Sequence, residues 1–229
     1  MNTSTENFTT LLFDFDGVII DSDSIIIEAW RMAAQKYGYI ISDEMAKRFI
    51  IGASPEFTLA MLFPRENTQQ RKIIHHLVDQ WEEKADYTLI PGVTTFLEAL
   101  NRHSVNIGLV TNSWPKKIDN ILRRYRLDMF AHIISRDDVT KGKPDPEPYL
   151  AAIGRFGSRA EQTLVFEDSC NGIAAALGAG ARCIAIGSTE QQYGVPAIAD
   201  FRQLFVTSEE PEWRFLDSPF GIKFVTDRN

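Results

Sequence analysis

The residues best suited to do chemistry are two aspartates near the N-terminus, Asp14 and Asp16. The apolar stretch 10–13 leads into Asp14 and predicts a short buried strand, and Gly17 then tolerates the backbone angles of a tight turn. Both acids therefore lie at the carboxyl end of a strand, the edge where open α/β sheets bind ligands. Two carboxylates repel each other there unless a cation lies between them, and Mg²⁺ favours carboxylates, waters and phosphate oxygens. The alternative is an Asp-Gly turn with solvated acids.

Three further polar groups follow predicted strands later in the chain: Thr111, Lys143 and the pair Glu167-Asp168. Parallel strands bring their carboxyl ends to one edge of a sheet, so we expect these side chains to converge with the two aspartates. Each group also has an ordinary explanation. Thr111 can belong to a simple turn, Lys143 can be a solvated loop residue, and Glu167-Asp168 can cap a helix. The order of the set and its complementary charges favour a site.

The chemistry that fits this set is phosphoryl transfer. We expect Asp14 to attack phosphorus and form an aspartyl phosphate, which splits one displacement into two easier ones. Asp16 is expected to protonate the leaving oxygen and then take a proton from water. Thr111, with the backbone N–H of Asn112, is expected to bind the phosphoryl oxygens, and Lys143 to supply positive charge. The predicted Mg²⁺ ligands are Asp14, Asp16, Asp168 and, directly or through a water, Glu167.

The chain predicts an α/β core interrupted by a helical block. Residues 23–86 show helical periodicity only, with helices expected at 23–37, 42–49, 55–63 and 68–85. The last of these is expected to present Ile73, Leu77, Trp81 and Ala85 on one face. From residue 87 strands and helices alternate, which predicts a parallel sheet covered on both faces. The expected domains are therefore 1–22 with 87–229 as the catalytic core, and 23–86 as an insertion.

In that core the expected strands are 105–110, 131–135, 163–166 and 181–186. The expected helices are 93–101, 115–124, 169–178 and one that enters from the loop 142–146 and ends near residue 156. The C-terminal stretch 209–229 is too aromatic for a solvated tail, and we expect it to pack on the core or on another subunit. We assign it no function.

Composition excludes several classes of partner. The chain has 229 residues, is 44% hydrophobic and carries a formal net charge of −7, which argues against binding nucleic acid or an anionic membrane. No apolar run reaches the roughly 18 residues of a membrane span, and the N-terminus shows no signal segment. The two cysteines, Cys170 and Cys183, have no metal-ligand spacing. We expect a cytoplasmic monomer or weak dimer that acts on a small phosphorylated metabolite.

Four motifs carry a resemblance to a known family. They are Asp14-Phe-Asp16-Gly-Val, Leu109-Val-Thr111-Asn-Ser113, Lys143-Pro-Asp-Pro and Val165-Phe-Glu167-Asp168-Ser-Cys-Asn-Gly172-Ile. With them the chain resembles the haloacid dehalogenase-like hydrolase superfamily, in its β-phosphoglucomutase-like branch, over about residues 10–205. The resemblance implies a Rossmann-like core, an α-helical cap at 23–86, Mg²⁺ dependence and an aspartyl-phosphate intermediate. Asp16 argues against the dehalogenases of this superfamily, which lack the second acid.

The cap distinguishes a phosphatase from a mutase. The β-phosphoglucomutases resemble this chain but have an Arg in the cap loop where Pro55 stands, a His where residues 25–27 are isoleucines, and a Lys near Asp79. Without these cations a second bound phosphate is disfavoured. We therefore predict a phosphatase that releases inorganic phosphate from a small organic phosphate such as a sugar phosphate. The alternatives are a hexose-phosphate mutase and, third, a catalytically idle binding protein of the same fold.

Substrate contacts are expected from both domains. In the cap, the loop around Gly52 and Ser54 is the candidate. On the core, Asn112 and Ser113 follow the second motif, and Lys116 in the first turn of the next helix is placed to reach a second anionic group on the substrate.

Overall fold

The structure is a computed structural model that describes residues 6–103, 105–187, 194–206, 212–215 and 221–224. The chain divides into two compact units. One comprises Met1–Ile20 together with Leu89–Asn229, and the other comprises Asp21–Thr88. The expected insertion at 23–86 lies inside the second unit, whose action as a cap remains a prediction.

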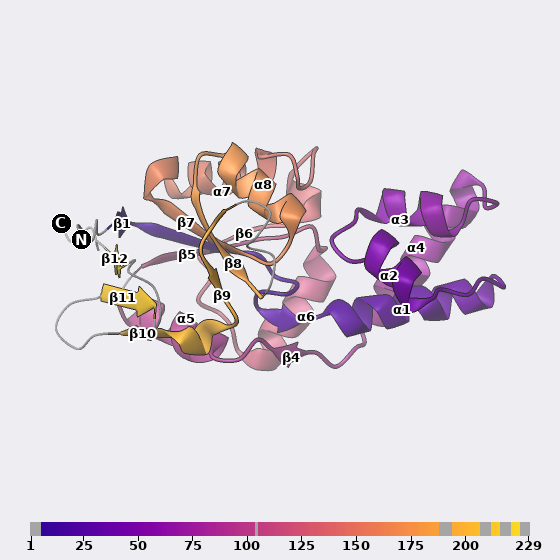
Figure 1. Ribbon diagram of the computed structural model, residues 1–229, viewed down its shortest axis with the longest axis horizontal. Helices are drawn as coiled ribbons and strands as arrows, with labels where there is room; N and C mark the ends of the chain where they lie inside the picture. Colours follow the sequence, from indigo (N-terminus) through magenta and orange to yellow (C-terminus); the bar gives the residue numbers. More distant parts are fainter. Residues whose placement is uncertain (1–5, 104, 188–193, 207–211, 216–220, 225–229) are drawn as a thin grey trace. The chain divides into compact units, whose positions relative to one another are not determined.

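A six-stranded parallel sheet forms the centre of the first unit (Figure 1). In spatial order its strands are β6 (His132–Ile134), β5 (Asn106–Val110), β2 (Thr10–Phe13), β7 (Thr163–Glu167), β8 (Arg182–Ile186) and β9 (Ala197–Ile198). All neighbours pair in parallel, and β2 lies between β5 and β7. The predicted α/β fold with a Rossmann-like parallel sheet is confirmed.

Helices cover this sheet on two faces. They are α5 (Val93–Arg102), α6 (Pro115–Tyr125), α7 (Glu147–Phe156) and α8 (Cys170–Gly178). Figure 1 shows α7 and α8 together on one side of the sheet and α5 on the other. Successive side chains of a strand point to opposite faces, so Leu12 joins the cluster formed with α7 and α8, whereas the ring of Phe13 contacts that of Phe96 on α5. Both faces of β2 are therefore buried, which fixes the position of the residue that follows it.

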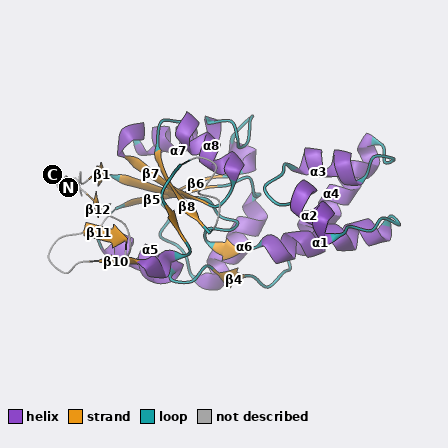
Figure 2. Ribbon diagram, in the orientation of Figure 1, coloured by secondary structure: helices purple, strands orange, loops and turns teal. Residues whose placement is uncertain are grey.

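A second sheet joins the two ends of the chain (Figure 2). Its strands, in order, are β1 (Glu6–Phe8), β12 (Gly221–Phe224), β11 (Glu212–Phe215) and β10 (Leu204–Val206). These strands are not predicted from the sequence, because each is only three or four residues long and shows little alternation. The described parts of the aromatic C-terminal stretch are thus sheet. The expectation for the rest of 209–229 falls outside the described residues.

The second unit is helical. Its helices are α1 (Asp23–Lys36), α2 (Asp43–Phe49), α3 (Pro55–Leu62) and α4 (Thr68–Glu82), and the two short strands β3 (Ile20–Asp21) and β4 (Thr88–Leu89) pair with each other where the chain enters and leaves. Ser42, Ser54 and Asn67 cap α2, α3 and α4 by accepting backbone N–H groups. Among the described residues of the chain, none forms a helix long and apolar enough to cross a membrane.

The prediction of which face of α4 is buried is wrong. Ile74 and Val78 are the apolar residues that α4 buries, while Ile73 and Trp81 are 46% and 48% exposed. The sequence offers two apolar stripes one residue apart, and the one that packs against the small side chains of α1 is buried. The helix also ends at Glu82 rather than Ala85.

Candidate active site

The site is built at the carboxyl end of β2. Phe13 is in register with Leu109 of β5 and with Phe166 of β7. Asp14 follows at once, and its backbone N–H donates to the carbonyl oxygen of Phe166 at 3.0 Å. The first aspartate therefore lies between the ends of two neighbouring strands, each of which continues into polar residues of the predicted site.

Lys143 reaches Asp14 from the loop before α7. Its Nζ donates to Asp14 Oδ1 at 2.6 Å, to Glu167 Oε1 at 2.5 Å and to the carbonyl oxygen of Val110 at 2.8 Å. The Lys143 side chain is 4% exposed. A buried ammonium is stable only when charged and polar partners replace its water, and all three of its protons are used here. Lys143 thus joins the ends of β2, β5 and β7.

Glu167 lies beneath the site as its most enclosed carboxylate, with no side-chain exposure. Besides Lys143, its Oε1 accepts the hydroxyl of Tyr149 on α7 at 2.6 Å. Its Oε2 accepts the backbone N–H of Asp168 at 3.2 Å and the hydroxyl of Ser169 at 3.3 Å. These bonds hold a buried charge that would otherwise be costly. Glu167 consequently has little capacity left to bind a metal ion directly.

Two glycines make room for these acids. A Cβ at Gly172 would stand 1.9 Å from the Glu167 carboxylate, so the first turn of α8 can pass it only as glycine. A Cβ at Gly17 would stand 1.9 Å from Asp168 Oδ2, and Gly17 also has a φ of +76°. The Asp-Gly turn of the first motif is therefore what brings the loop after β2 against Asp168.

Burial and charge shift the pKa values of the central pair. Burial raises the pKa of Asp14 to about 7; Lys143 opposes the shift, and the nearby Glu167 and Asp16 add to it. Burial alone would lower the pKa of Lys143, but the charges of Asp14 and Glu167 outweigh it and leave that pKa above its ordinary value. The ammonium is thus retained at neutral pH, and Asp14 is the member of the pair that titrates there.

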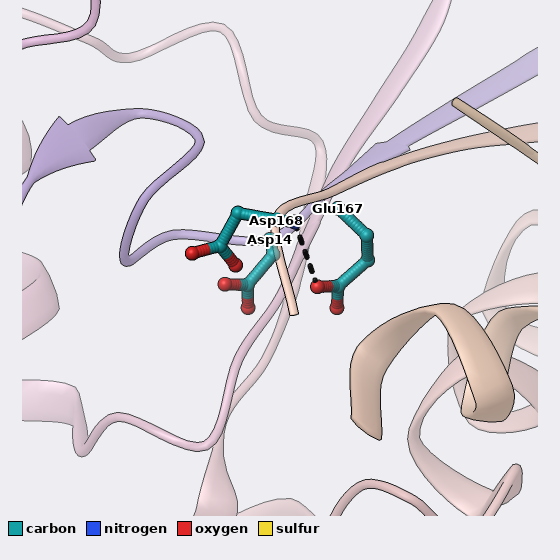
Figure 3. A group of neighbouring side chains, drawn as sticks. All are labelled: Asp14, Glu167 and Asp168. Atoms are coloured by element: carbon teal, nitrogen blue, oxygen red, sulfur yellow. Dashed lines mark hydrogen bonds between the residues drawn. The ribbon is translucent and has the colours of Figure 1, made fainter. Parts of the chain in front are cut away.

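Three acids could hold a metal ion. Asp14, Glu167 and Asp168 each offer a carboxylate oxygen, and these oxygens lie within 4.8 Å of one another (Figure 3). Figure 3 shows the carboxylates of Asp14 and Asp168 next to each other, with that of Glu167 to one side of them. Hard oxygen ligands of this kind suit a divalent cation such as Mg²⁺. The residues fit such an ion, with Asp14 and Asp168 as the ligands whose oxygens are best placed.

The second aspartate is held by a different set of groups. Asp16 Oδ2 accepts the Ser113 hydroxyl at 2.6 Å, and Asp16 Oδ1 accepts Lys117 Nζ at 2.7 Å. The backbone N–H of Ser113 in turn donates to Thr111 Oγ1 at 2.9 Å. The turn after β5 therefore connects Thr111 to Asp16. The expected role of Asp16 as a metal ligand remains a prediction.

Comparison with known protein families identifies the family to which the chain belongs. Residues 11–186 match the model of the family described as haloacid dehalogenase-like hydrolase. The chain belongs to this family. The match covers all four motifs, from Asp14 to Gly172.

Individual relatives of this haloacid dehalogenase-like hydrolase support the same family and the same class of enzyme. A phosphorylated carbohydrates phosphatase from Thermotoga maritima is 31% identical over 182 residues, which cover 74% of this chain and 81% of that protein. A β-phosphoglucomutase from Bacillus subtilis is 26% identical over 200 residues, 82% of this chain and 87% of that one. The predicted family and the predicted class, a phosphoric monoester hydrolase, are confirmed.

The fold is shared with solved structures. The crystal structure of a family IA, variant 3 hydrolase of this family from Entamoeba histolytica has a TM-score of 0.76 and 26% identity. The alignment covers 87% of this chain and 96% of that one. The likeness therefore extends over most of this hydrolase.

The structure locates the residues predicted to contact substrate but does not test whether they bind it. Lys116 is exposed on α6, and Asn112 is exposed while its Oδ1 accepts the backbone N–H of Lys143 at 3.3 Å. Gly52 and Ser54 belong to the other unit, where Ser54 caps α3. The roles of these residues in binding remain predictions.

Sequence analysis missed two residues of this site, Tyr149 and Lys117. Tyr149 follows the Lys143 motif on the buried face of α7. Lys117 stands four residues before the buried Ile121 on α6, so helical periodicity places it on the inward face, whereas Lys116 is turned away by one position. That periodicity was the signal that could have identified Lys117.

Proposed function

We propose that this hydrolase is a Mg²⁺-dependent phosphatase that hydrolyses a small phosphorylated metabolite, such as a sugar phosphate, through an aspartyl-phosphate intermediate. The observation that carries the proposal is the contact of Asp14, at the centre of the sheet edge, with the buried ammonium of Lys143 and its closeness to Asp168. A carboxylate beside a cation, at an edge where metal ligands gather, suits attack on an anionic phosphate.

In the first step Asp14 forms a bond to phosphorus, and the bond from phosphorus to the substrate oxygen breaks. Lys143 holds one oxygen of the Asp14 carboxylate and so leaves the other to attack. Because Thr111 Oγ1 already accepts an N–H, its hydroxyl proton is available for a phosphoryl oxygen. When bound, Mg²⁺ supplies positive charge that offsets the repulsion between the phosphate and the acids. Asp14 and Asp168 would hold the ion, and Glu167 would keep them in position through its hydrogen bonds to Lys143 and to the backbone N–H of Asp168.

Asp16 moves the protons in both steps. It donates a proton to the leaving oxygen in the first step and takes one from water in the second, when water attacks phosphorus and frees Asp14. The products are an alcohol and inorganic phosphate, and Asp16 returns to its starting form. This assignment requires the Asp16 carboxylate to keep a defined orientation between the two steps.

The mutase remains the second candidate because a β-phosphoglucomutase is among the relatives. The absence of the cap cations at Pro55 and Asp79 favours the phosphatase. Conversion of β-glucose 1-phosphate to glucose 6-phosphate, primed by a bisphosphate, would identify the mutase. Release of inorganic phosphate from a panel of phosphorylated sugars, sugar acids and nucleotides would identify the phosphatase.

Asp14→Asn tests the mechanism. This isosteric change removes the nucleophile, and we expect turnover with Mg²⁺ to fall at least about a thousandfold while the fold is kept. The matched control is Asp137→Asn, an exposed carboxylate of the same unit, for which phosphate release should stay within about twofold of the unsubstituted protein. Near-normal phosphate release by Asp14→Asn, or the lack of a covalent phosphoenzyme after rapid acid quench of the unsubstituted protein, would refute the mechanism.

A further inference from the structure

Asp16 has a rigid backbone but needs external partners for its side chain. The backbone N–H groups of Ile19 and Ile20 donate to the carbonyl oxygen of Phe15 at 2.9 and 3.1 Å, and that of Gly17 donates to Ile20 at 2.8 Å. The loop 15–20 is therefore closed on itself. The Asp16 carboxylate extends from it with 24% of its side chain exposed. Its orientation depends on the groups that bind its two oxygens.

Lys117 is an unexpected group to find there. Its side chain is 1% exposed, and it occupies the first turn of α6, where the helix dipole disfavours a cation. Burying an ammonium group in that position is unfavourable unless an anion offsets it. The carboxylate of Asp16, 2.7 Å away, is such an anion. The pair therefore carries a stability cost that an apolar side chain at this position of the helix would avoid, which points to a role in the site.

Trp114 encloses the other side of this ammonium. Lys117 Nζ lies 5.5 Å from the centre of the Trp114 ring, and the Arg136 guanidinium carbon lies 4.7 Å from it. Cations at such distances are attracted to the face of an indole ring. The backbone N–H of Arg136 also donates to the carbonyl oxygen of Ser113 at 3.1 Å. Lys117 is thus held by its helix and by the Trp114 ring, and the segment after β6 contacts that ring and Ser113 through Arg136.

We propose that Lys117 is a positioning residue for Asp16, with Ser113 as its partner on the second carboxylate oxygen. The inference rests on the proposed function, in which Asp16 transfers the protons. In this scheme Lys117 acts on the reaction through Asp16. Each aspartate of the first motif then has its own lysine: Lys143 for Asp14 and Lys117 for Asp16.

The test is a double-mutant cycle with p-nitrophenyl phosphate and MgCl₂. This probe releases a stable phenolate without protonation, so activity stays measurable when Asp16 is replaced. We expect Lys117→Met to lower kcat about 10- to 100-fold with KM within about twofold, because with this probe a misplaced Asp16 loses part of its contribution as the base of the second step. In the Asp16→Asn background the same change should alter kcat less than about twofold. Lys117→Arg should restore part of the lost rate.

Controls separate this role from a structural one. Arg123→Met removes a cation from the exposed face of the same helix, where Arg123 meets Asp119 at 3.5 Å, and should leave kcat unchanged. If Lys117→Met fails to fold, Ser113→Ala provides the same cycle through the other oxygen of Asp16. Equal losses from Lys117→Met with and without Asp16, or a native kcat in that variant, would overturn the inference alone. A lack of turnover by the unsubstituted protein would overturn the proposed function and the inference with it.

Discussion

The two lysine–aspartate pairs of the site differ in how much of the molecule depends on them. Lys143 is shared among Asp14, Glu167 and a carbonyl oxygen of β5, and both charged partners are buried. Lys117 pairs with Asp16, whose side chain is still 24% open to water. A buried pair whose partners have lost their water is costly to break, whereas water can replace a partner at the edge. We therefore expect Lys143 to affect both stability and activity, and Lys117 to affect chiefly activity.

Replacing Lys143 should have a larger effect on stability and activity than any other substitution considered for the site. Lys143→Met leaves Asp14 and Glu167 buried without their cation, so we expect stability to fall by about 3–5 kcal/mol and phosphate release by at least about a thousandfold. Urea unfolding and steady-state kinetics measure the two quantities. The loss of stability should be smaller at pH 5 than at pH 8, because burial raises the pKa of Asp14 and its unpaired carboxylate can then be protonated.

The matched control for this change is Lys141→Met, in the same loop, whose side chain is 71% exposed and lies 3.4 Å from Asp145. It should alter stability by less than about 1 kcal/mol. Lys143→Arg keeps the charge but replaces a compact ammonium with a planar fork, so it should not restore activity. Comparable stability losses for Lys143→Met and Lys117→Met would contradict the distinction between the two pairs.

Metal binding should depend on pH through Asp14. Its pKa in the folded, metal-free protein is raised from the ordinary 3.8 to about 7. The stability linked to this group is therefore fully present below pH 3.8 and is lost as the pH rises through 7. Mg²⁺ must displace the proton below pH 7, so its affinity should fall up to about tenfold for each pH unit below that value.

Isothermal titration with MgCl₂ from pH 5.5 to 8 measures this dependence without any turnover. In Asp14→Asn the titrating group is absent, so the variant should bind Mg²⁺ weakly and with a flatter pH profile. An affinity in the unsubstituted protein that is constant from pH 5.5 to 8 would show that Asp14 is not the ligand that exchanges a proton for the metal ion.

The difference between the pairs also explains what sequence could predict. Lys143 stands in a motif in which Pro144 and Pro146 follow it, and the strand order brings that motif to the edge where Asp14 lies. Lys117 stands beside Lys116, and only the inward direction of one helix face separates them. A pattern of local sequence identified the lysine on the loop, whereas packing of α6 decided which of two adjacent lysines is buried.

Tertiary packing also explains why the buried face of α4 and the short C-terminal strands were not predicted from the sequence. On α4 two apolar stripes compete, and the small residues of α1 determine that Ile74 and Val78 are buried. The strands β10, β11 and β12 are too short for a period of two to be visible, and they pair with one another and with β1 rather than with the main sheet. The edge that carries the candidate site could be predicted because β2, β5 and β7 are apolar runs that end in polar motifs.

Tyr149→Phe is the mildest change, because it removes a neutral hydrogen-bond donor beside the Lys143 pair and leaves every charge in place. The variant loses the 2.6 Å hydrogen bond to Glu167 Oε1, while Lys143 still donates to the same oxygen. A hydrogen bond to a charged group contributes about 1.5–3 kcal/mol, and the remaining donor should limit the loss to about 1–2 kcal/mol. Because Glu167 then holds Lys143 less firmly, we expect kcat to fall by less than about tenfold.

The control is Tyr87→Phe, which removes a buried hydroxyl that donates to the carbonyl oxygen of Glu82 at 3.1 Å in the other unit. It should cost a similar or smaller stability and leave kcat unchanged, so a kcat loss in both variants would attribute the effect of Tyr149 to stability rather than to its contact with Glu167.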